Sequence, residues 1–135
     1  MTTKRLEKIE DIAKLLTVKD DIEKYMPCTH TEWVQWLISQ IESKRVFIWA
    51  DIDEDSVINS YIVVFNMVNP PLGNHLFIPY VFSSLKIEEN LAVLEDIKEL
   101  ANSLGAKKIS AKVEKAENFK KYGFEKVAEI IELKV

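Results

Sequence analysis

The chain has 135 residues, of which 47% are hydrophobic and 30% are charged, and its formal net charge is -4. The length fits one globular domain with enough core to fold without a disulfide or a metal. The negative charge argues against a protein that binds nucleic acid through its overall electrostatic field.

Cysteine, histidine and apolar residues are distributed in a way that excludes several further classes. Cys28 is the only cysteine, so an internal disulfide and a zinc site built from cysteine pairs are excluded. With only two histidines, a histidine-rich metal site is not expected. No apolar run approaches the roughly 20 residues of a membrane helix, and the charged N-terminus lacks the core of a signal peptide. We therefore expect a cytoplasmic protein with no metal cofactor and no membrane or nucleic-acid partner.

The first 28 residues are expected to form a variable helical segment. Its apolar residues recur at spacings of three and four, as on one helical face: Leu6, Ile9, Ile12, Ala13 and Leu16. A short helical turn is expected within residues 20–26. A second helix is predicted over residues 31–43, because Thr29 and Glu32 have the spacing of a capping box and the apolar residues that follow share one face.

Three antiparallel strands are predicted next, over residues 46–50, 57–68 and 75–84. The segment "DIDEDS" provides a polar turn between the first two, and "NPPLGN" must form a loop. The acidic turn also resembles a calcium loop, but the glycine and the final acid that such a loop needs are replaced by Ser56 and Ile62. Pro79 predicts a bulge or an interrupted pairing within the third strand.

The last third of the chain predicts an amphipathic helix over residues 88–105, a strand over 107–113, a short helix over 116–122 and a closing strand over 124–135. The whole order predicts a single α/β (α+β) domain over residues 1–135. Its central sheet should be mixed but mostly antiparallel, with helices on both faces.

This order, together with the segment "ENFKKYGFEKV", resembles the GCN5-related N-acetyltransferase superfamily, in which a helix is commonly followed by a Gly-Phe pair and a last strand. The segment "ANSLGAKKI" looks like that family's junction between the central helix and the fifth strand. The resemblance covers the chain from about residue 29 onward, and the family's first strand is not assigned. It implies that acetyl-CoA lies between the neighbouring parallel strands 75–84 and 107–113, and that an amine attacks the thioester directly.

The resemblance also implies where the coenzyme is bound. The third strand would bind the pantetheine arm, and the turn that begins the central helix would bind the pyrophosphate. The cofactor-binding residues expected on this basis are Tyr80, Phe82, Ser83, Ser84, Lys86, Asn90, Asn118 and Phe119. The family's pyrophosphate motif contains glycines that allow backbone amides to approach the phosphates. The corresponding residues 83–93 contain no glycine, and Glu88 and Glu89 would repel a pyrophosphate.

The catalytic residues are less clearly marked. The family's general acid is a tyrosine four residues before the glycine of the Gly-Phe pair, and here that position is Phe119, which has no proton to donate. Tyr122 and Glu114 are therefore the catalytic candidates, with packing and an ordinary surface role as their respective alternatives. The family's acceptor site is lined partly by the second helix and the loop before it. That assigns substrate contacts to Cys28, His30 and Trp33, with core packing as the alternative for Trp33.

Two functions are left open by these residues. The first is an acyl-CoA-dependent N-acetyltransferase that uses acetyl-CoA and a small-molecule or peptide amine. The second is a protein of the same fold that has lost coenzyme A binding and acts as a binding or assembly module. The missing glycines, the two acids and Phe119 favour the second, whereas the correctly spaced scaffold favours the first. A homodimer is a further hypothesis, because the closing strand could pair with another copy at a sheet edge.

Overall fold

The structure is a computed structural model that describes residues 2–18, 27–68, 71, 73–79, 87–112, 116–129 and 131–135. The turn expected within residues 20–26 lies outside these ranges. The elements in chain order are β1 (Thr2–Leu6), α1 (Ile9–Ala13), the 3₁₀ helix η1 (Lys14–Thr17), α3 (His30–Ile41), β2 (Val46–Ile52), β3 (Ile58–Met67), β4 (His75–Ile78), α4 (Ile87–Leu104), β5 (Ile109–Ala111) and the 3₁₀ helix η2 (Ala116–Tyr122).

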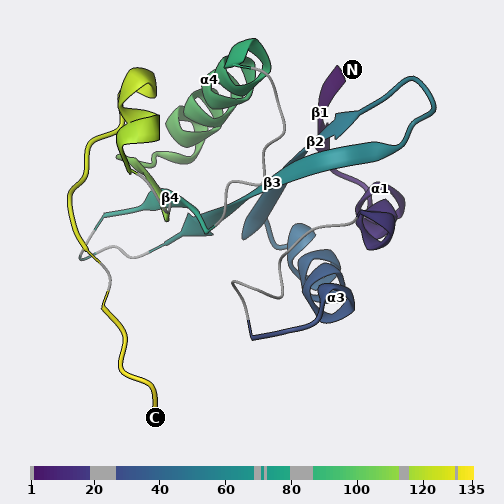
Figure 1. The fold of residues 1–135 in the computed structure, drawn as a ribbon, viewed down its shortest axis with the longest axis horizontal. Helices are drawn as coiled ribbons and strands as arrows, with labels where there is room; N and C mark the ends of the chain where they lie inside the picture. The colour runs from purple at the N-terminus through teal and green to yellow at the C-terminus, as the bar shows by residue number, and fades with distance from the viewer. Residues whose placement is uncertain are drawn as a thin grey trace.

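One five-stranded sheet organises these elements in the order β1-β2-β3-β4-β5. The first four strands run antiparallel to their neighbours, and β4 pairs with β5 in parallel. Helices α1 and α3 cover one face of the sheet and α4 covers the other (Figure 1). The predicted fold class, a mostly antiparallel mixed sheet with helices on both faces, is confirmed.

Strands β2 and β3 are largely buried on both faces, which explains why the sequence shows continuous apolar runs in them. On β2, Ile48 packs in the core beneath α1 and α3, whereas Trp49 packs in the core beneath α4. Both side chains are at most 3% exposed. Neighbouring side chains of β2 thus alternate between the two cores. This alternation fixes the pairing register of the strand, because a shift of one residue would move every side chain to the opposite face of the sheet.

The hairpin turn between β2 and β3 is confirmed. Asp53 Oδ1 accepts hydrogen bonds from the backbone N–H groups of Asp55, at 2.9 Å, and Val57, at 3.0 Å. This is the local use of an aspartate that favours turns. In the ranges that the structure describes, no group of three or more His, Cys, Asp or Glu residues is placed to hold a metal ion.

The N-terminal helical segment was predicted wrongly in its first part. Residues Thr2–Leu6 form β1, which pairs antiparallel with β2, and the helix α1 begins only at Ile9. Leu6 and Ile12 are both buried in the same core. Leu6 on the strand and Ile12 on the helix both point into this core, so their spacing in the sequence matches that of one helical face. The spacing of apolar residues alone could therefore not distinguish a strand followed by a helix from one continuous helix.

The closing strand predicted over residues 124–135 is also wrong for the residues that the structure describes. Residues 124–129 and 131–135 belong to no helix or strand. Phe124 is half-buried, but Val127, Ile131, Leu133 and Val135 are exposed. The β-branched residues gave this segment its strand pattern. Strand preference, however, reflects packing on a pleated, half-buried surface more than an intrinsic property of the backbone. In Figure 1 the segment leaves η2 and runs away from the sheet to the C-terminus.

The capping box at the start of α3 is confirmed, and it leads to a first prediction. Thr29 Oγ1 accepts from the Glu32 N–H at 3.2 Å, and Glu32 Oε1 accepts from the Thr29 N–H at 3.2 Å. We expect Thr29→Ala to lower the free energy of unfolding by about 1 kcal/mol, because the Glu32 N–H loses its acceptor. Thr31→Ala, at an exposed position of the same helix, should have almost no effect. Urea unfolding of both variants tests this, and equal losses would contradict it.

Candidate functional site

The candidate site is centred on the parallel pair β4–β5. Phe77 lies opposite Ser110 in the ladder, and Ile78 lies opposite Ala111. The Lys112 N–H donates to the Ile78 carbonyl oxygen at 3.0 Å, which is the last rung in the described part of the chain. The bend residue Pro79 follows directly and has no N–H to donate to a neighbouring strand. The chain thus bends at Pro79, where a bulge or an unpaired amide was predicted, and the rest of the predicted strand, residues 80–84, lies outside the described ranges.

The crossover between these parallel strands contains α4, whose 18 residues run from Ile87 to Leu104. The first N–H groups of a helix have no partner within it, and the helix dipole favours a negative charge there. Asn90 belongs to this first part of α4. Gly105 ends the helix with φ +72°, the left-handed conformation that glycine adopts at low cost.

Six of the residues assigned to the site lie outside the ranges that the structure describes: Tyr80, Phe82, Ser83, Ser84, Lys86 and Glu114. These residues belong to the two segments that directly follow β4 and β5. Their assignment to the coenzyme and to catalysis stays a prediction.

The Gly-Phe corner is built on η2, and three aromatic rings meet there. Phe119 lies with its ring centroid 6.3 Å from that of Tyr122 and 6.3 Å from that of Phe124. Gly123, at φ +90°, turns the chain, and its N–H donates to the Lys120 carbonyl at 2.9 Å. Asn118 lies on the same short helix. The structure thus places Tyr122 directly beside Phe119, the position of the family's acid, and both rings are half-buried.

The acceptor-side candidates gather at the start of α3, on the opposite face of the sheet from α4. Cys28 and His30 are half-buried there, and Cys28 packs against the core beneath α3. Trp33 is only 3% exposed, and its Nε1–H donates to the Tyr61 hydroxyl at 3.2 Å. The structure therefore places Trp33 in the core, which is the alternative left open by the sequence.

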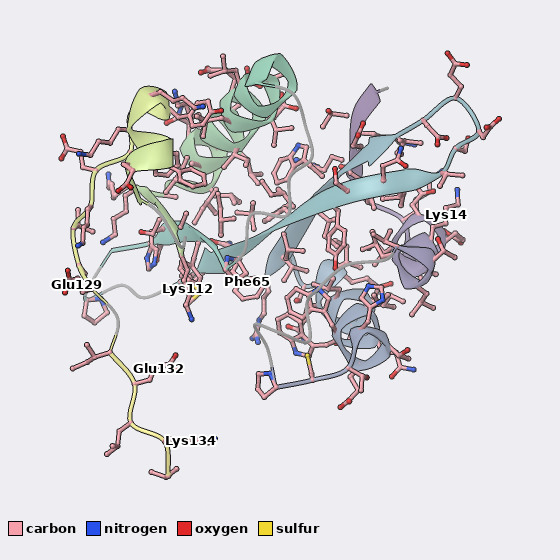
Figure 2. All side chains as sticks on the ribbon, in the orientation of Figure 1. Lys14, Phe65, Lys112, Glu129, Glu132 and Lys134 are labelled. Carbon is pink, nitrogen blue, oxygen red and sulfur yellow. The ribbon has the colours of Figure 1, made fainter. Side chains whose placement is uncertain are left out.

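An aromatic row that the sequence analysis did not identify runs from α3 across β3 to β4. It consists of Trp36, Phe65 and Phe77. The Trp36 and Phe65 centroids are 5.6 Å apart, and those of Phe65 and Phe77 are 6.4 Å apart. Trp36 is 43% exposed, and Phe65 and Phe77 are half-buried. Figure 2 labels Phe65, which lies between the sheet and the α3 layer. The row ends on β4, one of the two strands of the candidate site.

The chain is similar to known proteins in its structure. No protein-family model and no curated protein sequence matches the chain. A predicted acetyltransferase from Clostridium acetobutylicum, solved with acetyl-CoA, is similar with a TM-score of 0.74 and 17% identity, over 98% of this chain and 95% of that one. An acetyltransferase from Trypanosoma brucei is similar with a TM-score of 0.72 and 13% identity, over 99% of each chain. The chain has the GCN5-related N-acetyltransferase fold.

The range of proteins that share this acetyltransferase fold is wide. The aminoglycoside 6'-N-acetyltransferase of Acinetobacter haemolyticus is similar with a TM-score of 0.68 at 9% identity, over 100% of this chain and 98% of that one. The family resemblance inferred from the order of elements and from the Gly-Phe corner is thus confirmed for the fold. In this acetyltransferase fold, β1 is the strand that the sequence analysis did not assign.

Proposed function

We propose that the protein transfers the acetyl group of acetyl-CoA to the nitrogen of an amine. The observation that carries this proposal is the parallel pair β4–β5, whose described rungs end at Ile78 and Lys112 with Pro79 next in the chain. That is the position at which the family resemblance places the opening for the thioester. In the reaction the amine nitrogen forms a bond to the thioester carbonyl carbon, the C–S bond breaks, and coenzyme A leaves as a thiolate.

The coenzyme would be bound mainly by backbone. The segment after Ile78 would bind the pantetheine arm, with contacts from Tyr80, Phe82, Ser83 and Ser84. The first N–H groups of α4 would bind the pyrophosphate, together with Lys86 and Asn90.

Proton transfer would come from the two catalytic candidates. Glu114, which follows the end of β5 at Ala111 by three residues, would accept a proton from the ammonium group of the acceptor. Tyr122 would donate its hydroxyl proton to the departing thiolate, since its ring packs against Phe119, 6.3 Å away between centroids. Both groups would act on reacting atoms close to the end of the β4–β5 ladder.

The acceptor would approach along the α3 face, opposite α4. The start of α3 would contribute Cys28 and His30, and the aromatic row would provide an apolar surface for the body of the amine. Aromatic faces also attract cations, so an ammonium group is suited to such a surface. We propose a small-molecule or peptide amine as the acceptor and the cytoplasm as the location. The described helices include none that is both long enough and apolar enough to span a bilayer.

A second candidate function has its own support. Residues 83–93 contain no glycine, the first turn of α4 contains Glu88 and Glu89, and phenylalanine stands at the family's acid position. A protein that had kept this fold as a binding or assembly module, without coenzyme A, would show these features.

Titration calorimetry with acetyl-CoA separates the two functions. We expect micromolar binding to the wild type, and about tenfold weaker binding to Asn90→Glu because the added charge faces the pyrophosphate. Asn102→Glu is the matched control, since it adds the same charge to an exposed position near the other end of α4. No heat and no thermal shift at millimolar acetyl-CoA would contradict the transferase and favour the binding module.

A further inference from the structure

The C-terminal tail, residues 124–135, exposes apolar side chains to an unusual degree. Val127 is 88% exposed, Ile131 is 92% exposed and Leu133 is 88% exposed. Burying a Val, Leu or Ile side chain of this kind is worth about 1.5–3 kcal/mol. Exposed apolar groups that are contiguous, rather than scattered, indicate a surface that another molecule covers.

The end of the tail has the pattern of a strand that is buried on one face. Ile131, Leu133 and Val135 alternate with the charged residues Glu132 and Lys134. In an extended chain successive side chains point to opposite sides, so three apolar side chains share one side and two charged ones share the other. The tail is thus suited to join a sheet, although it pairs with no strand in the described structure.

A complementary edge is present at β5. The sheet ends at this strand, and among the described residues none pairs with its outer side. Ile109 and Ala111 on β5 are only half-buried against the core beneath α4. An unprotected edge with apolar side chains beside it is a template for pairing with another chain.

The tail runs away from the sheet of its own chain. The corner at Gly123 turns the chain, and the Phe124 N–H donates to the Phe119 carbonyl at 3.3 Å. Beyond the corner the tail passes the end of β5, where Glu132 Oε1 lies 3.9 Å from Lys112 Nζ (Figure 2), and then extends away from the domain. Both of these side chains are well exposed, so their attraction holds the tail only weakly.

We propose that the C-terminal tail of one copy of this chain pairs with the outer edge of β5 in a second copy, so that two exchanged tails form a symmetric dimer. A two-fold arrangement uses the tail and the β5 edge of both copies, which leaves neither unpaired. Because β5 is one of the two strands of the candidate site, the tail of the second copy completes the wall of that site. The dimer does not depend on the proposed acetyl transfer.

The oligomeric state tests the role of the tail. Light scattering and sedimentation equilibrium should show a dimer for the wild type. Ile131→Ser/Leu133→Ser should raise its Kd about a hundredfold, because two apolar side chains no longer become buried. Glu132→Gln/Lys134→Gln is the control on the opposite side of the same strand, with no change in net charge, and should change the Kd by no more than about twofold. A monomeric wild type, or a dimer unaffected by the serine pair, would overturn the proposal.

Cross-linking distinguishes exchange between copies from folding of the tail onto its own sheet. In a Cys28→Ser background, which removes the only native cysteine, one chain carries Ser110→Cys on β5 and a size-tagged chain carries Lys134→Cys on the tail. Both positions lie on the face opposite that of Ile109, Ala111 and the apolar side chains of the tail. With a short bismaleimide, the exchange predicts an adduct of the two differently sized chains. If the doubly substituted chain gives only an internal adduct and the mixture gives none, the tail pairs within one chain and the proposal fails.

Discussion

Trp33→Ala is expected to lower the free energy of unfolding by about 3–5 kcal/mol, a loss typical of deleting a large buried aromatic side chain. Trp33 is 3% exposed and packs against Trp36 and Phe65, with centroids 5.7 Å and 6.2 Å away. Its removal would leave a cavity beneath α3 and would take the indole donor away from the buried Tyr61 hydroxyl. Urea unfolding followed by circular dichroism measures the loss.

Trp36→Ala is the matched control, since the residue is of the same type, lies on the same helix and stacks on Trp33 at an interplanar angle of 13°. Because Trp36 is 43% exposed, we expect its removal to cost about 1 kcal/mol. In a transferase it should mainly raise KM for an apolar amine. If Trp33→Ala instead left the stability unchanged and raised KM, then Trp33 would be a substrate contact, as first hypothesised from the sequence, and the assignment to the core would be wrong.

The parts of the fold that the sequence predicted are those that depend on local chemistry. The capping box of Thr29 and Glu32 marks the start of α3, and Gly105 marks the end of α4. Strands β2 and β3 were recognisable because both of their faces are buried, which requires unbroken apolar runs. Each of these signals is contained within a few neighbouring residues.

The two errors in the fold have one cause, which is that a strand depends on its partner. Residues 2–6 contain little apolar sequence, yet they form β1 because the edge of β2 is available to pair with them. The tail has the β-branched residues of a strand, yet it is not paired within the described chain. The composition of a segment indicates whether its side chains would fit a half-buried sheet surface. It does not indicate whether the fold offers that segment a neighbouring strand to pair with.

The candidate site was predictable to a similarly limited extent. The sequence placed the parallel strands, the crossover helix and the Gly-Phe corner, because these follow one another along the chain. It did not identify the aromatic row, because Phe65 and Phe77 become neighbours only through the register of β3 and β4. It assigned Trp33 rather than Trp36 to the acceptor side, because a spacing of three residues on a helix does not show which of two rings lies deeper.

Glu88→Gln/Glu89→Gln is expected to tighten acetyl-CoA binding by about tenfold or more, because each carboxylate near a pyrophosphate costs on the order of 1 kcal/mol. Both residues belong to the first turn of α4, where the proposed function places the pyrophosphate. An acid in this turn ordinarily stabilises the helix dipole, so the double variant should lose some stability while it gains affinity. Calorimetry and thermal unfolding on the same samples measure both effects.

The control for this variant is Asp96→Asn/Glu99→Gln, which removes the same charge from exposed positions in the middle of α4. If the pyrophosphate lies at the first turn, the control should leave the affinity almost unchanged, and the advantage of the first variant should shrink as salt screens the charges. Equal gains from both variants would mean that only the overall charge matters, and the site would not lie at this turn. If even the neutralised turn binds no acetyl-CoA, the two acids are not what prevents binding. The absence of the family's glycines is then the better explanation, and the binding module becomes the function to pursue.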